Sequence, residues 1–262
     1  MSVNSYLENL AGELILSSTE KDSIRISINT LYTRLNSYFE SDIEEKFVFG
    51  SYSRVTILPR KVDENSDIDC MVVFDNSNNY KPQTFLDKLR KFAEIKYSTS
   101  EIHQSSPTIV LELNHIKFEL VPAYRNYLGT YYISDGNGGW IATYPNDFNS
   151  RLTITNNNNY YKIKPLVRLI KEWNVKVNNH ELTSYKIEER IAYNMDYAYL
   201  YCVNYVDYVK KAFNELKNIT YSTSVRNRID LALSRIDKAI EYENVNMTYL
   251  ALEEIKKVFP EV

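Results

Sequence analysis

The sequence predicts an α+β fold, with a mixed sheet in its first half and a helical lobe in its second half. Two observations support this division. Up to about residue 140, short apolar runs typical of strands alternate with helical segments. From Asp147 onward, almost every segment has helical periodicity. We therefore expect two domains, residues 1–140 and residues 141–262, with the boundary set to within about ten residues.

The first elements are predicted to be helical, from about residue 5 to residue 40. Apolar side chains recur there at steps of three and four residues, which is the spacing of one helix face. A polar patch at residues 17–21 is expected to divide this segment into two helices. The apolar run 47–49 follows and predicts a strand that ends in a turn at Gly50 and Ser51.

Further strands and a helix complete the first domain. Residues 67–74 predict a strand whose second half is buried, and a proline near the first turn predicts a helix over residues 82–97. Residues 108–113 and 116–121 are separated by a two-residue turn, so we expect a hairpin. Residues 129–140 are rich in glycine and tyrosine, and we expect them to form a loop.

The second domain is predicted to consist of helices. Their expected ranges are 160–175, 183–194, 197–216, 225–242 and 247–259. No stretch approaches the roughly 18 consecutive apolar residues of a membrane span, so we expect no contact with a membrane. With two distant cysteines and no signal peptide, we expect reduced thiols and a cytoplasmic location.

The charge balance bears on the class of substrate. The formal net charge of the chain is −3. A protein that binds a long nucleic acid usually carries a basic surface, because neutralising phosphates dominates its affinity. The sequence therefore favours small charged substrates, although a local basic patch remains open.

Three carboxylates form the candidate catalytic group. Asp67 and Asp69 are two residues apart on one strand, so their side chains point to the same face. A neighbouring strand that carries Glu119 on this face would add a third carboxylate. Adjacent carboxylates repel each other, and a divalent cation is their natural partner. Ligands that are all oxygen favour Mg²⁺ or Mn²⁺.

Such a site suits nucleotidyl transfer. Two bound cations activate an attacking hydroxyl and steady a departing pyrophosphate. Because Gly50 has no side chain, the backbone there can approach a ligand closely. The hydroxyl and amide of Ser51 could hold a triphosphate. Each feature alone also fits a simpler interpretation: a turn at Gly50-Ser51, a solvated or capping Asp67 and Asp69, and a surface-exposed Glu119. Their order along the chain favours the functional interpretation.

The same residues carry a resemblance to a known family. Phe49-Gly50-Ser51, fifteen intervening residues and then Asp67-Ile68-Asp69 resemble the signature of the polymerase-β-like nucleotidyltransferase superfamily. The stretch from Gly50 to Pro59, with Ser66 to Asp69, is similar to the bacterial cGAS/DncV-like nucleotidyltransferases, whose catalytic domain is called SMODS. The resemblance implies a polymerase-β-like core with a mixed sheet, a helical C-terminal lobe, and synthesis of cyclic oligonucleotide signals in anti-phage defence.

The resemblance extends into the helical half. The segment around Lys171 resembles the family segment whose lysine binds phosphate. Ser184 and Tyr185 resemble a Ser-Tyr pair whose serine contacts the triphosphate and whose tyrosine stacks on a base. Lys171 could instead be a solvated helix residue, and Tyr185 is one of 23 tyrosines. Glu119 departs from the family, which more often has aspartate there, and this difference moves the ligating oxygens by one methylene.

The sequence therefore predicts a metal-dependent nucleotidyltransferase that joins nucleoside triphosphates into a cyclic oligonucleotide. Nucleoside triphosphates are its expected partners, long nucleic acids are not, and an effector that responds to the product is expected downstream. One alternative is transfer to a macromolecule such as tRNA or a protein hydroxyl. Another is a catalytically silent nucleotide-binding module, although retention of all three carboxylates argues against it.

Overall fold

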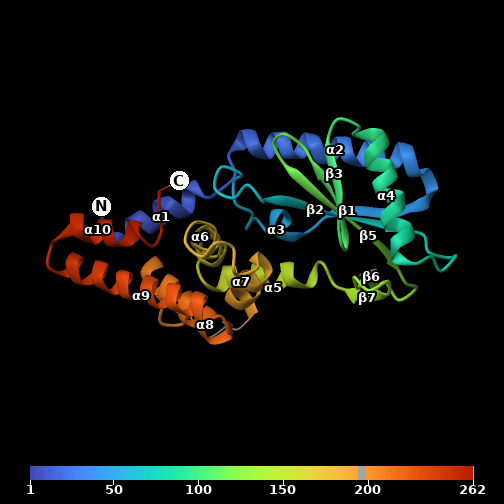
Figure 1. Ribbon diagram of the computed structural model, residues 1–262. Coiled ribbons are helices and arrows are strands. Elements are labelled where there is room, and N and C mark those ends of the chain that lie inside the picture. The colour runs from blue at the N-terminus through green and yellow to red at the C-terminus, as the bar shows by residue number, and fades with distance from the viewer. Residues whose placement is uncertain (194–198, 262) are drawn as a thin grey trace. The chain divides into compact units, whose positions relative to one another are not determined.

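The computed structural model describes residues 1–193 and 199–261 (Figure 1). Contacts between residues divide the chain into two compact units. The sheet unit comprises Ser17–Arg60 and Asn65–Asn149. The helical unit comprises Met1–Leu16, Lys61–Glu64 and Ser150–Val262. The two-domain division with a boundary near residue 140 stays a prediction, and each unit is described by itself.

The sheet unit contains three helices, a 3₁₀ turn and the strands of one sheet. Its elements are α2 (Ser18–Phe39), η1 (Glu40–Asp42), β1 (Ile43–Val48), α3 (Gly50–Ser53), β2 (Asp67–Phe74), α4 (Pro82–Lys96), β3 (Glu101–Ser105), β4 (Thr108–Glu112), β5 (Lys117–Arg125), β6 (Tyr131–Ser134) and β7 (Trp140–Thr143).

Within the described residues, seven strands form one mixed sheet, with the order β1-β2-β5-β4-β3. β2 and β5 are parallel, and the pairs β1–β2, β4–β5 and β3–β4 are antiparallel. β5 pairs with β4 along its first half and with β6 near its end, and β6 pairs with β7. The mixed sheet and the predicted hairpin, which is β4–β5, are therefore confirmed.

Two helices cover one face of the sheet. The ring of Phe74, at the end of β2, lies 5.2 Å from Phe39 of α2 and 4.8 Å from Phe85 of α4, measured between ring centroids. α2 and α4 thus pack on one face of the sheet (Figure 1). Ile68 and Cys70, both fully buried, lie on the same face. Because side chains alternate along a strand, Asp67 projects from the opposite face.

The helical unit is built around an aromatic core. Trp173 and Phe213 meet edge to face with ring centroids 4.9 Å apart, and Phe213 also contacts Phe259. The chain enters this unit within α5. Its elements are α1 (Val3–Glu13), α5 (Asp147–Asn158), α6 (Ile163–Lys176), α7 (Ser184–Tyr193), α8 (Tyr205–Ile219), α9 (Thr223–Asn244) and α10 (Thr248–Lys256).

Most predicted helices are confirmed, with shifted ends. The break expected at 17–21 falls at residues 14–17, between α1 and α2. The helix ends expected at Asn194 and Tyr197 lie outside the described residues. The early start expected for the helix 197–216 is wrong, because residues 199–204 are not helical and α8 begins at Tyr205. No described helix is long and apolar enough to cross a bilayer.

Three local predictions were wrong or incomplete. Residues 129–140 are not all loop, because β6 pairs with both β5 and β7 and the ring of Tyr132 stacks on Tyr124 at 5.0 Å. β3 was missed, because it is an edge strand of polar, largely exposed residues without an apolar run. Gly50 and Ser51 begin the short helix α3 rather than a plain turn.

Candidate active site

The three predicted carboxylates lie on adjacent parallel strands. In the register of β2 and β5, Asp69 pairs with Glu119 and Asp67 pairs with Lys117. Adjacent strands lie about 4.8 Å apart, so all four side chains project from one small area of the same face. The three carboxylate residues are partly exposed, whereas Ile68 between the aspartates is fully buried. The expected position of Glu119 on a neighbouring strand is confirmed, and its role as a ligand stays a prediction.

Gly50 lies directly against Asp69. Its φ is +71°, and a Cβ atom built there would stand 1.8 Å from Oδ2 of Asp69. The adjacent Phe49 amide donates to the Asp69 carbonyl at 3.0 Å. Any larger residue at position 50 would therefore displace the Asp69 carboxylate and strain the backbone. The glycine is required by this close approach, which the sequence predicted only in general terms.

Ser51 anchors the segment that follows Gly50. Its carbonyl accepts hydrogen bonds from the amides of Thr56 and Ile57 at 2.9 and 3.2 Å. Ser53 adds a further bond, from its hydroxyl to the Gly50 carbonyl at 3.0 Å. These bonds hold the chain after β1 in a compact form, with Ser51 partly exposed beside the carboxylates. Contact between Ser51 and a triphosphate stays a prediction.

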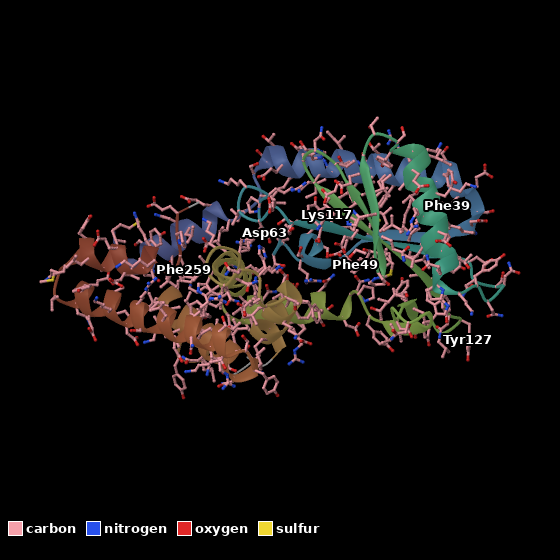
Figure 2. All side chains as sticks on the ribbon, in the orientation of Figure 1. Phe39, Phe49, Asp63, Lys117, Tyr127 and Phe259 are labelled. Atoms are coloured by element: carbon pink, nitrogen blue, oxygen red, sulfur yellow. The ribbon has the colours of Figure 1, made fainter. Side chains whose placement is uncertain are left out.

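The cluster also contains a cation of the chain itself. The ammonium of Lys117 lies 3.7 Å from Oδ2 of Asp67 and 3.8 Å from Oε1 of Glu119. Figure 2 labels Lys117 on the sheet unit. A positive charge therefore already lies between two of the carboxylates, which supports their suitability for a cation. Within residues 1–193 and 199–261, no group of three or more His, Cys, Asp or Glu side chains is gathered closely enough to hold a metal as it stands. The donor set fits Mg²⁺ or Mn²⁺, and its side chains need to converge on the ion.

The nearby thiol takes no part in this chemistry. Cys70 follows Asp69 on β2 and is fully buried on the opposite face of the strand. Burial raises the pKa of the Cys70 thiol to about 12. It therefore stays protonated at neutral pH and supplies neither a nucleophile nor a thiolate ligand.

In the helical unit, Lys171 is a buried residue with a partner. Its side chain is 5% exposed, and its ammonium forms an ion pair with the carboxylate of Glu188, which is 1% exposed. The pair joins α6 to α7. The alternative interpretation of Lys171, a solvated helix residue, is therefore wrong. Its contact with phosphate stays a prediction that has to account for Glu188.

Ser184 and Tyr185 begin α7. Both are exposed, with Tyr185 at 53% of its maximum. The backbone amide of Lys186 donates to the hydroxyl of Thr183 at 3.3 Å, which closes the first turn of the helix. An exposed aromatic ring beside an exposed hydroxyl offers a stacking face and a hydrogen-bond donor. Glu188 lies one turn further along the same helix, so Ser184 and the buried ion pair share one side of α7.

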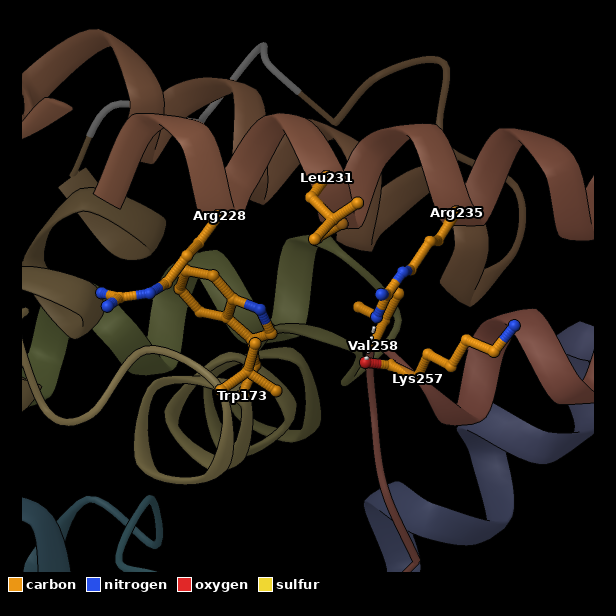
Figure 3. A pocket seen from close by; sticks show the side chains of 8 residues that line it. Trp173, Arg228, Leu231, Arg235, Lys257 and Val258 are labelled. Atoms are coloured by element: carbon orange, nitrogen blue, oxygen red, sulfur yellow. Dashed lines mark hydrogen bonds between the residues drawn. The ribbon is translucent and has the colours of Figure 1, made fainter. Parts of the chain in front are cut away.

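A small pocket in the helical unit is a less suitable nucleotide site. It has a volume of about 20 Å³, close to the room that one water molecule requires. Figure 3 shows Trp173 and two arginines of α9, Arg228 and Arg235, among the residues that line it. Arg228 pairs with Glu181, and Arg235 donates to the Lys257 carbonyl at 3.0 Å. Its volume excludes a nucleotide.

A family model matches residues 1–156, which is more than half of the chain and includes every candidate residue of the sheet unit. Its description is "Second Messenger Oligonucleotide or Dinucleotide Synthetase domain", abbreviated SMODS. The chain belongs to the SMODS family. This confirms the resemblance that the Gly50–Asp69 segment carries.

Curated relatives agree with this assignment. The chain is 28% identical to a probable cyclic nucleotide synthase of Bacillus cereus (strain VD146), over 80% of each protein. It is 30% identical to a cyclic GMP-AMP synthase of Staphylococcus schleiferi, over 48% of each protein.

Solved structures show the same fold. The cyclic AMP-GMP synthase DncV of Vibrio cholerae matches with a TM-score of 0.78 at 11% identity, over 98% of this chain and 96% of DncV. CdnC of E. coli MS115-1, determined with ATP, matches with a TM-score of 0.76 at 16% identity, over 98% of each chain. The predicted fold class, a nucleotidyltransferase core with a mixed sheet and a helical C-terminal part, is confirmed.

This SMODS protein is an enzyme, a nucleotidyltransferase that makes cyclic oligonucleotides or dinucleotides from nucleoside triphosphates. The first of the three functions predicted from the sequence is thereby confirmed. The family assignment says less about which residues carry the reaction.

Sequence reasoning missed two charged residues beside the candidate site residues. Lys117 was not among the residues singled out from the sequence, although its spacing of two residues from Glu119 on a strand already implies a shared face. Glu188 carried no signal by itself. Its pairing with Lys171 joins residues 17 positions apart on different helices.

Proposed function

We propose that Asp67, Asp69 and Glu119 hold the divalent cations of this SMODS enzyme, Mg²⁺ or Mn²⁺. The observation that carries the proposal is the strand register, which makes Asp69 the direct neighbour of Glu119 with Asp67 on the same face. Partial exposure keeps the three side chains within reach of a bound substrate. The Lys117 ammonium between Asp67 and Glu119 supports a preference of this area for positive charge.

The division of roles follows from the two strands. Asp67 and Asp69, from one strand, would hold both cations, and Glu119 would serve the one nearer the acceptor hydroxyl. When bound, the cations supply activation of that hydroxyl and neutralise charge on the departing pyrophosphate. Gly50 keeps the backbone against Asp69, which limits the orientations open to that carboxylate. Ser51 would contact the triphosphate beside it.

In the helical unit, we assign Tyr185 to stacking on a nucleobase and Ser184 to contact with phosphate. Their exposure at the start of α7 supports these roles. For Lys171, contact with a β- or γ-phosphate requires that the ammonium be shared between the phosphate and Glu188. The buried pair would then hold the lysine in position before the substrate arrives.

Because the enzyme makes cyclic products from nucleoside triphosphates, the acceptor is a second small nucleotide. The net charge of −3 supports small substrates over a nucleic acid track. Cyclisation requires the first product to stay bound and turn, so that its free hydroxyl reaches the carboxylates. The enzyme would act in the cytoplasm, where Cys70 and Cys202 stay reduced, and an effector would respond to the product.

The experiment is a product screen. Purified protein is incubated with each combination of labelled nucleoside triphosphates and with Mg²⁺ or Mn²⁺, and phosphatase-resistant products are identified. We expect at least one cyclic product, lost in the Asp67→Asn/Asp69→Asn variant. Asp22→Asn is the matched control, because Asp22 is exposed on α2 of the same unit and pairs with Arg25 on its own helix.

Two further results bear on the acceptor. A small acceptor engages few charges, so the reaction should respond weakly to salt, whereas an enzyme that grips several RNA phosphates loses affinity steeply. If label appears only on added tRNA or protein under every base mixture, the small-acceptor proposal is wrong.

A further inference from the structure

Without a bound metal, the three carboxylates of the candidate site repel one another. Asp67, Asp69 and Glu119 carry like charges on one face of two adjacent strands. At about 4 Å, like charges near a protein surface repel by up to a few kcal/mol, and the fold tolerates this only with a nearby positive charge. Lys117 supplies one such charge, 3.7 Å from Asp67 and 3.8 Å from Glu119.

We propose that Lys117 is an internal counter-cation, which screens the carboxylates while the site holds no metal and competes with the divalent cation for them. This inference rests on the proposed metal site and deepens it. It makes Lys117 a positioning residue that acts through the ligands.

The strand register fixes Lys117 beside Asp67 and Glu119. It faces Asp67 directly across the parallel pair and precedes Glu119 by two residues on its own strand, so all three side chains share one face. The lysine side chain is only 15% exposed, less than Asp67 at 28% and Glu119 at 25%. Its ammonium is therefore directed along the carboxylate face rather than into bulk water.

The distances indicate screening rather than a tight ion pair. Both N–O separations exceed the 2.7–3.2 Å of a direct hydrogen bond, so the attraction between the ammonium and the carboxylates is mainly Coulombic. A divalent cation held by Asp67 and Glu119 would repel the ammonium and displace it. Lys117 thus cancels one of the three negative charges and raises the metal concentration at which the site fills.

Mn²⁺ binding without nucleotide tests this directly. The variants are Lys117→Met, which removes the charge, and Lys117→Arg, which keeps it. Lys91→Met is the matched control, because Lys91 is an exposed lysine on α4 of the same unit. Free Mn²⁺ is measured by electron paramagnetic resonance during titration, so the readout does not depend on activity.

We expect Lys117→Met to bind Mn²⁺ roughly tenfold more tightly than the wild type, with Lys117→Arg and Lys91→Met close to the wild type. In EDTA, loss of the counter-charge should lower the unfolding temperature of Lys117→Met by about 2–4 °C, and excess Mg²⁺ should restore it. Unchanged or weaker Mn²⁺ binding by Lys117→Met, relative to Lys91→Met, overturns the inference.

The inference and the proposed function can fail separately. If Asp67→Asn/Asp69→Asn binds Mn²⁺ as tightly as the wild type, the metal site is wrong and the role of Lys117 is wrong with it. If the Lys117 variants behave as expected but the product screen yields no cyclic nucleotide, the proposed reaction fails while the counter-cation stands.

Discussion

The sheet unit and the helical unit combine charged side chains in opposite ways. On the sheet, Asp67, Asp69 and Glu119 gather like charges in a partly exposed area. In the helical unit, Lys171 and Glu188 bring opposite charges together with almost no exposure. The first arrangement costs stability until a cation arrives, and the second is costly only when one partner is removed.

Charged residues in a fold can therefore serve one of two roles, ligand binding or packing. A group of like-charged carboxylates with access to solvent favours a bound cation. A buried, oppositely charged pair satisfies itself and holds two helices in register, so by itself it indicates packing. The role of Lys171 in phosphate binding therefore needs stronger proof than the role of Asp67 or Asp69.

The largest expected effect is the loss of activity when the two aspartates of β2 are replaced. Asp67→Asn/Asp69→Asn should abolish metal-dependent synthesis, because the ligands of the cations are removed. Its thermal stability should be unchanged or higher, because the carboxylate repulsion is relieved. Product formation and differential scanning calorimetry on the same preparation check both. A double variant with full turnover would contradict the central assignment.

Glu188→Ala should show the reverse pattern. Breaking a buried ion pair by removing one partner leaves an uncompensated charge, and the free energy of unfolding should fall by about 3–5 kcal/mol. Urea unfolding measures this change. Asp237→Asn is the control, because its pair with Lys210 is exposed and its loss should cost less than about 1 kcal/mol.

Replacing both Lys171 and Glu188 tests whether the stability lost in Glu188→Ala comes from the unpaired charge. A Lys171→Met/Glu188→Leu variant should recover much of the lost stability, since well-packed apolar residues often replace a buried pair without cost. If it also retains nucleotide binding, Lys171 is structural and does not contact phosphate.

Glu172, next to Lys171 on α6, offers a test by pH. It is fully buried, and desolvation raises its pKa from 4.5 to about 7, although Lys176 at 3.2 Å opposes the shift. A carboxyl whose pKa is raised by folding stabilises the protein below its unfolded pKa. That contribution is lost as the pH rises from 4.5 to about 7.

Glu172→Gln should therefore gain stability relative to the wild type across this pH window, by up to about 3 kcal/mol at neutral pH. Urea unfolding at pH 4.5, 6 and 7.5 follows the difference. The exposed Glu189→Gln on α7 is the control and should show no such trend. A constant difference between Glu172→Gln and the wild type would mean that Glu172 titrates normally.

The smallest expected effect concerns Tyr185. Tyr185→Ala should weaken nucleotide binding by about 1–3 kcal/mol, which is the range for stacking of a base on an aromatic ring. Tyr185→Phe keeps the ring and should cost much less, as measured by isothermal titration calorimetry with a non-hydrolysable triphosphate. If phenylalanine is as damaging as alanine, the hydroxyl matters and stacking is the wrong explanation.

Much of the fold was determined by the sequence because its signals are local. The step of three and four residues in residues 5–40 and the apolar run after Asp69 depend only on nearby residues. The alternation of side chains along a strand likewise assigns Asp67 and Asp69 to one face from their spacing alone. The edge strand β3 and the hairpin β6–β7 lack such signals although their partners are near in sequence, because β3 is polar and largely exposed and β6 and β7 are four-residue strands around a glycine-rich turn.

Tertiary structure alone decided which charges meet. The register of two parallel strands, joined through more than forty intervening residues, makes Asp69 the neighbour of Glu119 and brings Lys117 to Asp67. Helix packing likewise buries Lys171 against Glu188, where the sequence allowed a solvated lysine. Periodicity is a property of one segment, whereas the partner of a charge depends on how segments pack. The sequence therefore supplied the candidate ligands, and the fold supplied the counter-charges that control them.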